Sequence, residues 1–92
     1  MKLTENEKYL LIKLHCKIEQ SKFFAMQGFI FDYEAFRITM EIEGIKKEFI
    51  EENTNSLVIK KYVKILSNKI EITKKGYNFI KNTAIREVIK WA

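Results

Sequence analysis

The chain is 92 residues long, 47% hydrophobic and 32% charged, so we expect one soluble domain over residues 1–92 rather than a disordered segment. No apolar run approaches the roughly 20 residues that a bilayer-spanning helix needs, and the polar start is not expected to be a signal peptide. Cys16, the only cysteine, excludes an intrachain disulfide and fits a reducing, cytoplasmic location.

The net charge of +5 is unevenly distributed along the chain. Residues 1–52 hold eight Lys+Arg and ten Asp+Glu, whereas residues 53–92 hold nine Lys+Arg and two Asp+Glu. This asymmetry indicates that the C-terminal part meets a polyanion such as nucleic acid, or an acidic protein. Solubility of a lysine-rich chain is the alternative explanation.

The first predicted element is a helix that begins at a capping box formed by Thr4 and Glu7. Its apolar stripe is expected at Leu11, Leu14 and Ile18, with Leu10 beside them. Ser21 and Gly28 are both candidates for its end.

A short buried strand is predicted next, at Phe29–Phe31. Asp32 then suits the N-cap of a helix of one or two turns over residues 33–37. A further helix is predicted from Thr39 to Asn53, ended by the turn formers of residues 53–56.

This third helix is expected to turn one stripe inward, at Ile42, Ile45 and Phe49. Gly44 lies inside it at a cost of about 1 kcal/mol relative to alanine.

A β-hairpin is predicted over residues 57–73. Residues 57–66 are rich in β-branched and aromatic residues, Ser67-Asn68 is a turn-forming pair, and residues 69–73 alternate, with Ile70 and Ile72 on one face.

Thr73 is expected to cap a last helix, and Gly76 would let its first turn lie close to the sheet. The inward face of this helix is predicted at Tyr77, Ile80 and Ala84.

This order of elements predicts an α+β winged helix, a helix-turn-helix variant with a β-hairpin wing and a C-terminal helix. Three stretches support it further: FDYEAFRIT at 31–39, TMEIEGIKKEFIEEN at 39–53 and EITKKGYNFIKN at 71–82. In these stretches the chain resembles the YjcQ-like family of small winged-helix proteins from Gram-positive bacteria and their phages. The resemblance implies the fold and an origin in a phage or mobile element, and it implies little about mechanism.

Lysines dominate the predicted hairpin, where Glu71 is the one acidic residue between 57 and 75. Contacts of such lysines with phosphates give affinity and salt dependence rather than sequence recognition. The candidate nucleic-acid contacts are Lys46, Lys47, Lys60, Lys61, Lys64, Lys69, Lys74 and Lys75. Protection of an exposed strand edge by lysines is the alternative.

The helix predicted at 39–53 does not resemble a conventional recognition helix. Its five glutamates outnumber Lys46 and Lys47 and would be repelled by the phosphates of DNA. Two functions therefore stay open. One is a regulator that binds duplex DNA through the hairpin. The other is a protein-binding module, such as a phage-borne inhibitor or antirepressor, in which Glu48, Glu51 and Glu52 contact a basic protein surface.

We expect no enzyme, cofactor or metal site. His15 and Cys16 are neighbours on a helix and point about 100° apart, so they do not converge on one metal ion. With three glycines, the chain has no glycine-rich phosphate loop.

The end of the chain carries more apolar residues than one helical stripe holds. Either the helix breaks near Asn82 and folds over, or part of this surface meets a second subunit. On the second interpretation a homodimer is predicted, with contacts at Ile85, Val88, Ile89 and Trp91.

Overall fold

The computed structural model describes residues 2–25 and 30–91, and the side chains of residues 2–20 and 31–83. Within these ranges the chain forms four helices and one three-stranded antiparallel sheet, a small α+β fold. The elements in order are α1 (Glu5–Ala25), β1 (Ile30–Asp32), α2 (Tyr33–Ile42), α3 (Lys47–Ile59), β2 (Val63–Leu66), β3 (Lys69–Ile72) and α4 (Lys74–Trp91).

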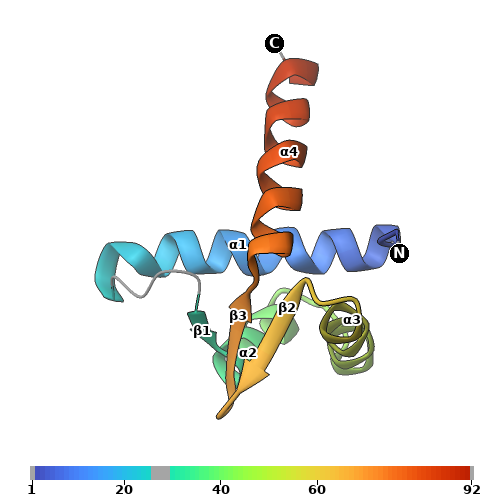
Figure 1. The fold of residues 1–92 in the computed structure, drawn as a ribbon. Helices are drawn as coiled ribbons and strands as arrows, with labels where there is room; N and C mark the ends of the chain where they lie inside the picture. Colours follow the sequence, from blue (N-terminus) through green and yellow to red (C-terminus); the bar gives the residue numbers. More distant parts are fainter. Residues whose placement is uncertain (1, 26–29, 92) are drawn as a thin grey trace.

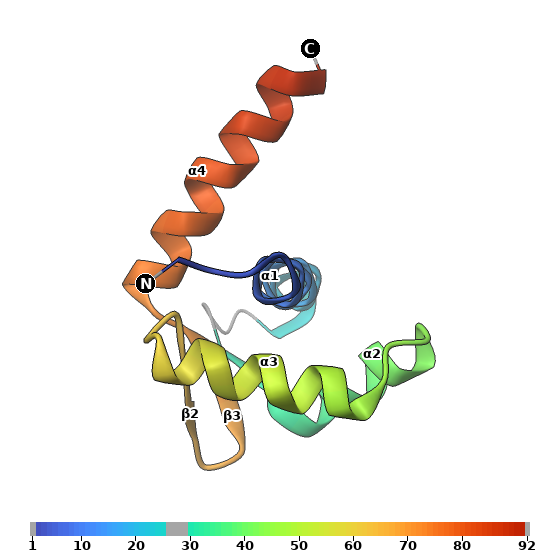
Figure 2. The same cartoon turned by 90° about the vertical axis from the view of Figure 1, so that its right-hand side faces the viewer.

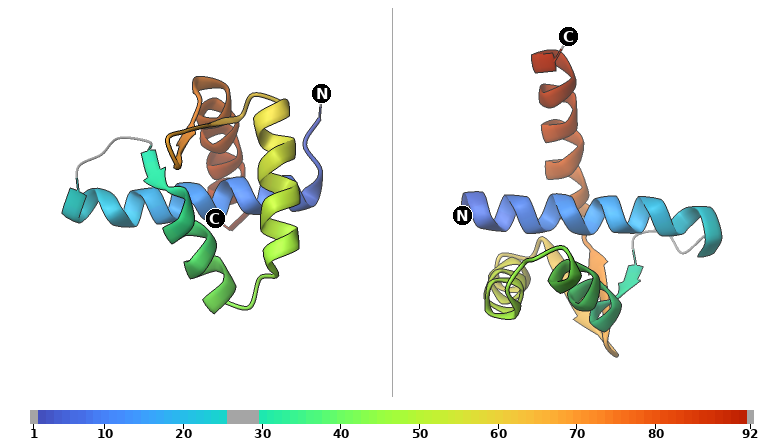
Figure 3. Two further views of the ribbon diagram at one scale, coloured as in Figure 1. Left: turned by 90° about the horizontal axis from the view of Figure 1, so that it is seen from below. Right: turned by 180° about the vertical axis from the view of Figure 1, so that it is seen from behind.

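Helix α1 is the centre of the molecule. The β2–β3 hairpin and α4 extend from opposite sides of it (Figure 1), and α3 lies across it on the hairpin side (Figure 2). Viewed from below, α2 and α3 both lie under α1 (Figure 3). The hairpin turn and the C-terminal end of α4 therefore project from opposite sides of the fold.

The predicted start and buried stripe of α1 are confirmed. The Thr4 hydroxyl accepts from the backbone N–H of Glu7 at 3.1 Å, and the Glu7 carboxylate accepts from the N–H of Thr4 at 2.7 Å. The buried stripe consists of Leu10, Leu11, Leu14 and Ile18. Burial of each such side chain contributes about 1.5–3 kcal/mol to folding.

The prediction of a single helix over residues 39–53 is wrong, because α2 ends at Ile42 and α3 begins at Lys47. Gly44 has φ +95° and ends α2: its N–H donates to the Glu41 carbonyl, and the N–H of Ile45 donates to the carbonyl of Met40. These two bonds form a Schellman motif, which a glycine in a left-handed conformation favours.

The predicted start and inward stripe of that helix are wrong in part. Thr39 lies inside α2, where its hydroxyl donates to the carbonyl of Phe36. Ile42 is 79% exposed, whereas Ile45 and Phe49 pack against the core. The Asp32 cap is confirmed, since its carboxylate accepts from the N–H of Ala35 at 2.9 Å, but α2 continues past the predicted end.

The turn after α2 is held against α1 by charge. The Glu43 carboxylate pairs with Lys17 and, at 2.9 Å, with Lys13. Hydrogen bonds from Lys17 and Lys13 lower the pKa of Glu43 from 4.5 to about 2.

Residues 53–56 do not end a helix, because Thr54 and Leu57 are buried on the inner face of α3 together with Ile50. This packing outweighs the turn preference of the segment. Helix α3 ends in a second Schellman motif, in which Lys61 has φ +68° and the N–H of Tyr62 donates to the Leu57 carbonyl.

The predicted hairpin exists but is shorter, since residues 57–59 are helical and the strands run from Val63 to Ile72. Ser67 and Asn68 have φ of 51° and 62°, as a two-residue type I′ turn requires. The strand order is β1-β3-β2, so the short predicted strand pairs with β3, with Phe31 opposite Ile70.

Candidate nucleic-acid interface

The hairpin presents two different faces. The inner face carries Val63, Ile70 and Ile72, which are buried in the core. Residues opposite one another in an antiparallel pair share a face, so Lys64 and Glu71 lie with the pair Leu66 and Lys69 on the outer face.

The base of the hairpin is closed by Thr73. Its hydroxyl donates to the carbonyl of Lys61 at 2.7 Å, with the Tyr62 carbonyl at 3.0 Å, and accepts from the N–H of Gly76. The predicted cap is therefore confirmed. A Cβ on Gly76 would lie 2.2 Å from the Tyr62 carbonyl oxygen, so only glycine allows this approach of α4 to the hairpin.

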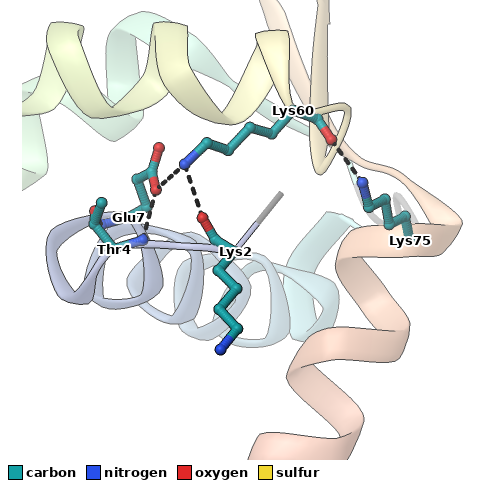
Figure 4. A network of polar contacts seen from close by, with 5 residues as sticks. All are labelled: Lys2, Thr4, Glu7, Lys60 and Lys75. Atoms are coloured by element: carbon teal, nitrogen blue, oxygen red, sulfur yellow. Dashed lines mark hydrogen bonds and ion pairs between the residues drawn. The ribbon is translucent and has the colours of Figure 1, made fainter.

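Two of the candidate lysines have hydrogen-bond partners at this base, although Lys75 is exposed (Figure 4). The Lys60 ammonium donates to the Glu7 carboxylate at 2.7 Å and to the Lys2 carbonyl at 3.0 Å, and its side chain is 18% exposed. The Lys75 ammonium donates to the carbonyl of Lys60 at 3.0 Å and lies 4.5 Å from the centre of the Tyr62 ring. Both cations have protein partners.

Glu7 is the buried centre of this network, with 3% of its side chain exposed. Burial raises the pKa of Glu7, but hydrogen bonds from Lys60 and from Thr4 outweigh burial, so the pKa lies below its ordinary value. The carboxylate therefore stays charged and ties the start of the chain to the end of α3. No local pattern predicts this pair, because the two residues are 53 positions apart.

The remaining hairpin lysines are exposed. Lys64 pairs with Glu71 at 3.1 Å across the two strands. Among residues with described side chains, Lys61, Lys69 and Lys74 form no ion pair. Residues 61–74 hold four lysines and one glutamate, so the hairpin keeps a positive charge.

The exposed face of α3 differs in character. Glu48, Glu52, Asn55 and Ile59 follow one another at helical spacing, and all four are exposed. Lys47 pairs with Glu51 on the same helix at 3.7 Å. Lys46 precedes α3, is exposed and forms no ion pair with the described side chains. Within α3 itself, Lys47 stands against three glutamates.

Two exposed apolar residues near these charges are not predicted from the sequence. Leu66, beside the hairpin turn, is 74% exposed, and Ile59, the last residue of α3, is 70% exposed. Their types predict burial. Their exposure becomes apparent only from the structure, in which β2 ends at Leu66 and α3 continues to Ile59.

The predicted dimer contacts Ile85, Val88, Ile89 and Trp91 lie in α4, and their side chains are outside the described residues, as is that of Ala84. Ile80 is buried as predicted, whereas Tyr77 is exposed. Among described residues, no group of three or more His, Cys, Asp or Glu could hold a metal ion. His15 pairs with Glu19 at 3.4 Å.

Searches with this chain find no matching protein-family model, curated protein or solved structure. In the part of the chain that the structure describes, none of the helices has the length and apolar character to cross a membrane.

Proposed function

We propose that the chain is a winged-helix domain that binds duplex DNA through phosphate contacts of its β2–β3 hairpin. The element order and the strand order β1-β3-β2 are compatible with this fold. The observation that carries the DNA proposal is the exposure of Lys61, Lys69 and Lys74 without ion pairs among the described side chains. Lys69 lies on β3 of the hairpin that projects from the body (Figure 2), and Lys61 and Lys74 lie at the base of that hairpin.

In this proposal α3 does not enter the major groove as a conventional recognition helix does. Glu48 and Glu52 on its exposed face would be brought close to phosphates and repelled. Binding is therefore led by the hairpin and is insensitive to base sequence, since phosphate contacts position a protein without distinguishing bases. Lys60 and Lys75 are engaged at the base of the hairpin, and Lys46 precedes α3, whose start lies away from the hairpin (Figure 2).

A role as regulator of a phage or mobile element is proposed on the resemblance to YjcQ-like proteins alone. A cytoplasmic location is proposed on the single cysteine.

A salt titration of binding to random-sequence duplex DNA tests the proposal. The logarithm of the affinity should fall with the logarithm of the salt concentration by about 0.9 per phosphate contact. The variant K69A/K74A should flatten this slope by about 1.8. Lys8→Ala is the matched control, because Lys8 lies on α1 and pairs with Glu5 at 3.2 Å, away from the hairpin.

Two outcomes would contradict DNA binding by the hairpin. One is no measurable affinity of the native protein at low salt. The other is a slope in K69A/K74A equal to that of the Lys8→Ala control.

Protein binding through α3 is the second candidate, favoured by one observation. Glu48 and Glu52 are exposed one turn apart without ion pairs among the described side chains, and the same face ends in the exposed Ile59. Such a face fits a basic protein surface that also carries an apolar residue. The variant E48Q/E52Q separates the two candidate functions. Its affinity for DNA should rise if α3 merely lies near bound DNA. Its complex with a basic protein partner should weaken if the carboxylates contact that partner.

A homodimer through the C-terminal part of α4 is proposed on the apolar residues at 85, 88, 89 and 91. That part of α4 extends beyond α1 with none of the other elements beside it (Figures 1 and 2). Sedimentation at micromolar concentration tests this, with a dimer expected and an 11.0 kDa monomer contradicting it.

A further inference from the structure

We propose that Leu66 acts as a wedge that enters the minor groove of duplex DNA and unstacks a base step. This inference rests on the proposed function and adds how the hairpin engages the duplex. Leu66 is an exposed, apolar residue beside the projecting turn of the hairpin.

Leu66 is the last residue of β2, is 74% exposed and lies opposite Lys69 in the strand register. The next residue on the same face of β2 is Lys64, two positions earlier. The apolar side chain therefore has a lysine on each side. One of these lysines, Lys69, forms no ion pair with the described side chains.

The turn itself is rigid enough to present a wedge. Ser67 and Asn68 form a two-residue turn between paired strands, and the Asn68 carbonyl accepts from the N–H of Tyr33 at 3.0 Å. Asp32 lies opposite Lys69 in the register of β1 and β3, and its carboxylate accepts a hydrogen bond from the N–H of Ala35. The hairpin end is thus fixed to α2 and presents leucine, lysine and an asparagine.

This combination fits a minor groove. Proteins that bind there insert apolar residues such as leucine between base steps, and use lysine and asparagine on the groove edges and phosphates. The hairpin turn is narrow, and Figure 2 shows it standing clear of α3, so the acidic face of that helix does not have to follow it into the groove.

The test is energy transfer between dyes on the two ends of a short random-sequence duplex, measured at low salt. The native protein should bend the duplex by an angle between about 20° and 90°. Leu66→Ala should bind with the same salt slope and lose the bend. Leu66→Lys should bind more tightly, because it adds a cation, and also lose the bend.

Ile59→Ala is the control for general loss of exposed apolar surface, because Ile59 is similarly exposed but lies on α3. It should keep the bend. Thermal unfolding of each variant checks that the fold is retained. A bend in Leu66→Ala equal to the native bend, or native binding without any bend, overturns the wedge and leaves DNA binding intact. Absence of DNA binding by the native protein removes both proposals.

Discussion

Replacement of Lys60 by methionine should destabilise the fold strongly, although lysine is a surface residue in most proteins. Methionine keeps the length of the side chain and removes its charge. The Glu7 carboxylate, 3% exposed, would then remain buried with only the Thr4 N–H as hydrogen-bond donor among the described contacts. Removal of one partner from a fully buried pair costs about 3–5 kcal/mol. Because Lys60 keeps 18% exposure, we expect a loss of about 2–3 kcal/mol.

Urea unfolding at neutral pH measures this loss, as a lower midpoint with an unchanged slope. Lys61→Met is the matched control, since the neighbouring lysine is exposed and unpaired among the described side chains, and it should stay within about 0.5 kcal/mol of the native protein. The double variant E7Q/K60M should be more stable than Lys60→Met alone, because glutamine leaves no buried charge.

The pH dependence gives an independent check. Without Lys60, burial should raise the pKa of Glu7, so the carboxylate destabilises the fold when ionised and ceases to do so as pH falls through that raised pKa. The difference between Lys60→Met and the native protein should therefore shrink on acidification. Equal stability of Lys60→Met and Lys61→Met would contradict a stabilising role of the Lys60–Glu7 pair.

Four further variants test the backbone and the ion pairs that Glu43 forms with α1. Gly76→Ala places a Cβ 2.2 Å from the Tyr62 carbonyl oxygen and should destabilise by about 1–3 kcal/mol in urea unfolding; native-like stability would contradict the close approach. Gly44→Ala should destabilise and Lys61→Gly should stabilise, each by about 1 kcal/mol, because both positions are left-handed. Calorimetry measures both changes in stability, and changes of the opposite sign would contradict the left-handed conformations at the ends of α2 and α3. Glu43, with a folded pKa of about 2 against 4.5, should contribute stability that is complete above 4.5 and lost as pH falls towards 2. Glu43→Gln should make the unfolding midpoint less dependent on pH between 4.5 and 2. The same pH dependence in Glu43→Gln as in the native protein would contradict the pairing of Glu43 with Lys13 and Lys17.

Local patterns predicted the parts of the fold that depend on neighbouring residues. The capping box of α1, the Asp32 cap, the Ser67-Asn68 turn, the alternation at 69–73 and the Gly76 approach all involve groups close in sequence or a strict period. These are the interactions that short-range sequence rules describe.

The predictions were wrong where tertiary packing or a left-handed backbone position decided the structure. Residues 57–59 have strand propensity, but burial of Thr54 and Leu57 on the inner face of α3 keeps the segment helical. Gly44 was assigned a position within a helix, whereas its positive φ ends α2. The sequence gives no sign that Lys61 adopts a left-handed conformation, because that position usually holds glycine.

The sequence predicts the candidate site as a set of lysines, but not which of them form hydrogen bonds or ion pairs within the protein. The charge asymmetry and the hairpin location followed from composition and pattern. The engagement of Lys60 by Glu7 did not, since it joins residues 53 positions apart. The exposure of Leu66 depends on where β2 ends, and strand ends are poorly defined by pattern alone.

Amide chemical-shift mapping of the native protein with random-sequence duplex DNA at low salt tests hairpin-led binding most directly. We expect the largest shifts within residues 61–74 and small shifts for Glu48, Glu52 and Asn55 on the exposed face of α3. Shifts concentrated on α3, or no shifts at any DNA concentration, would contradict it.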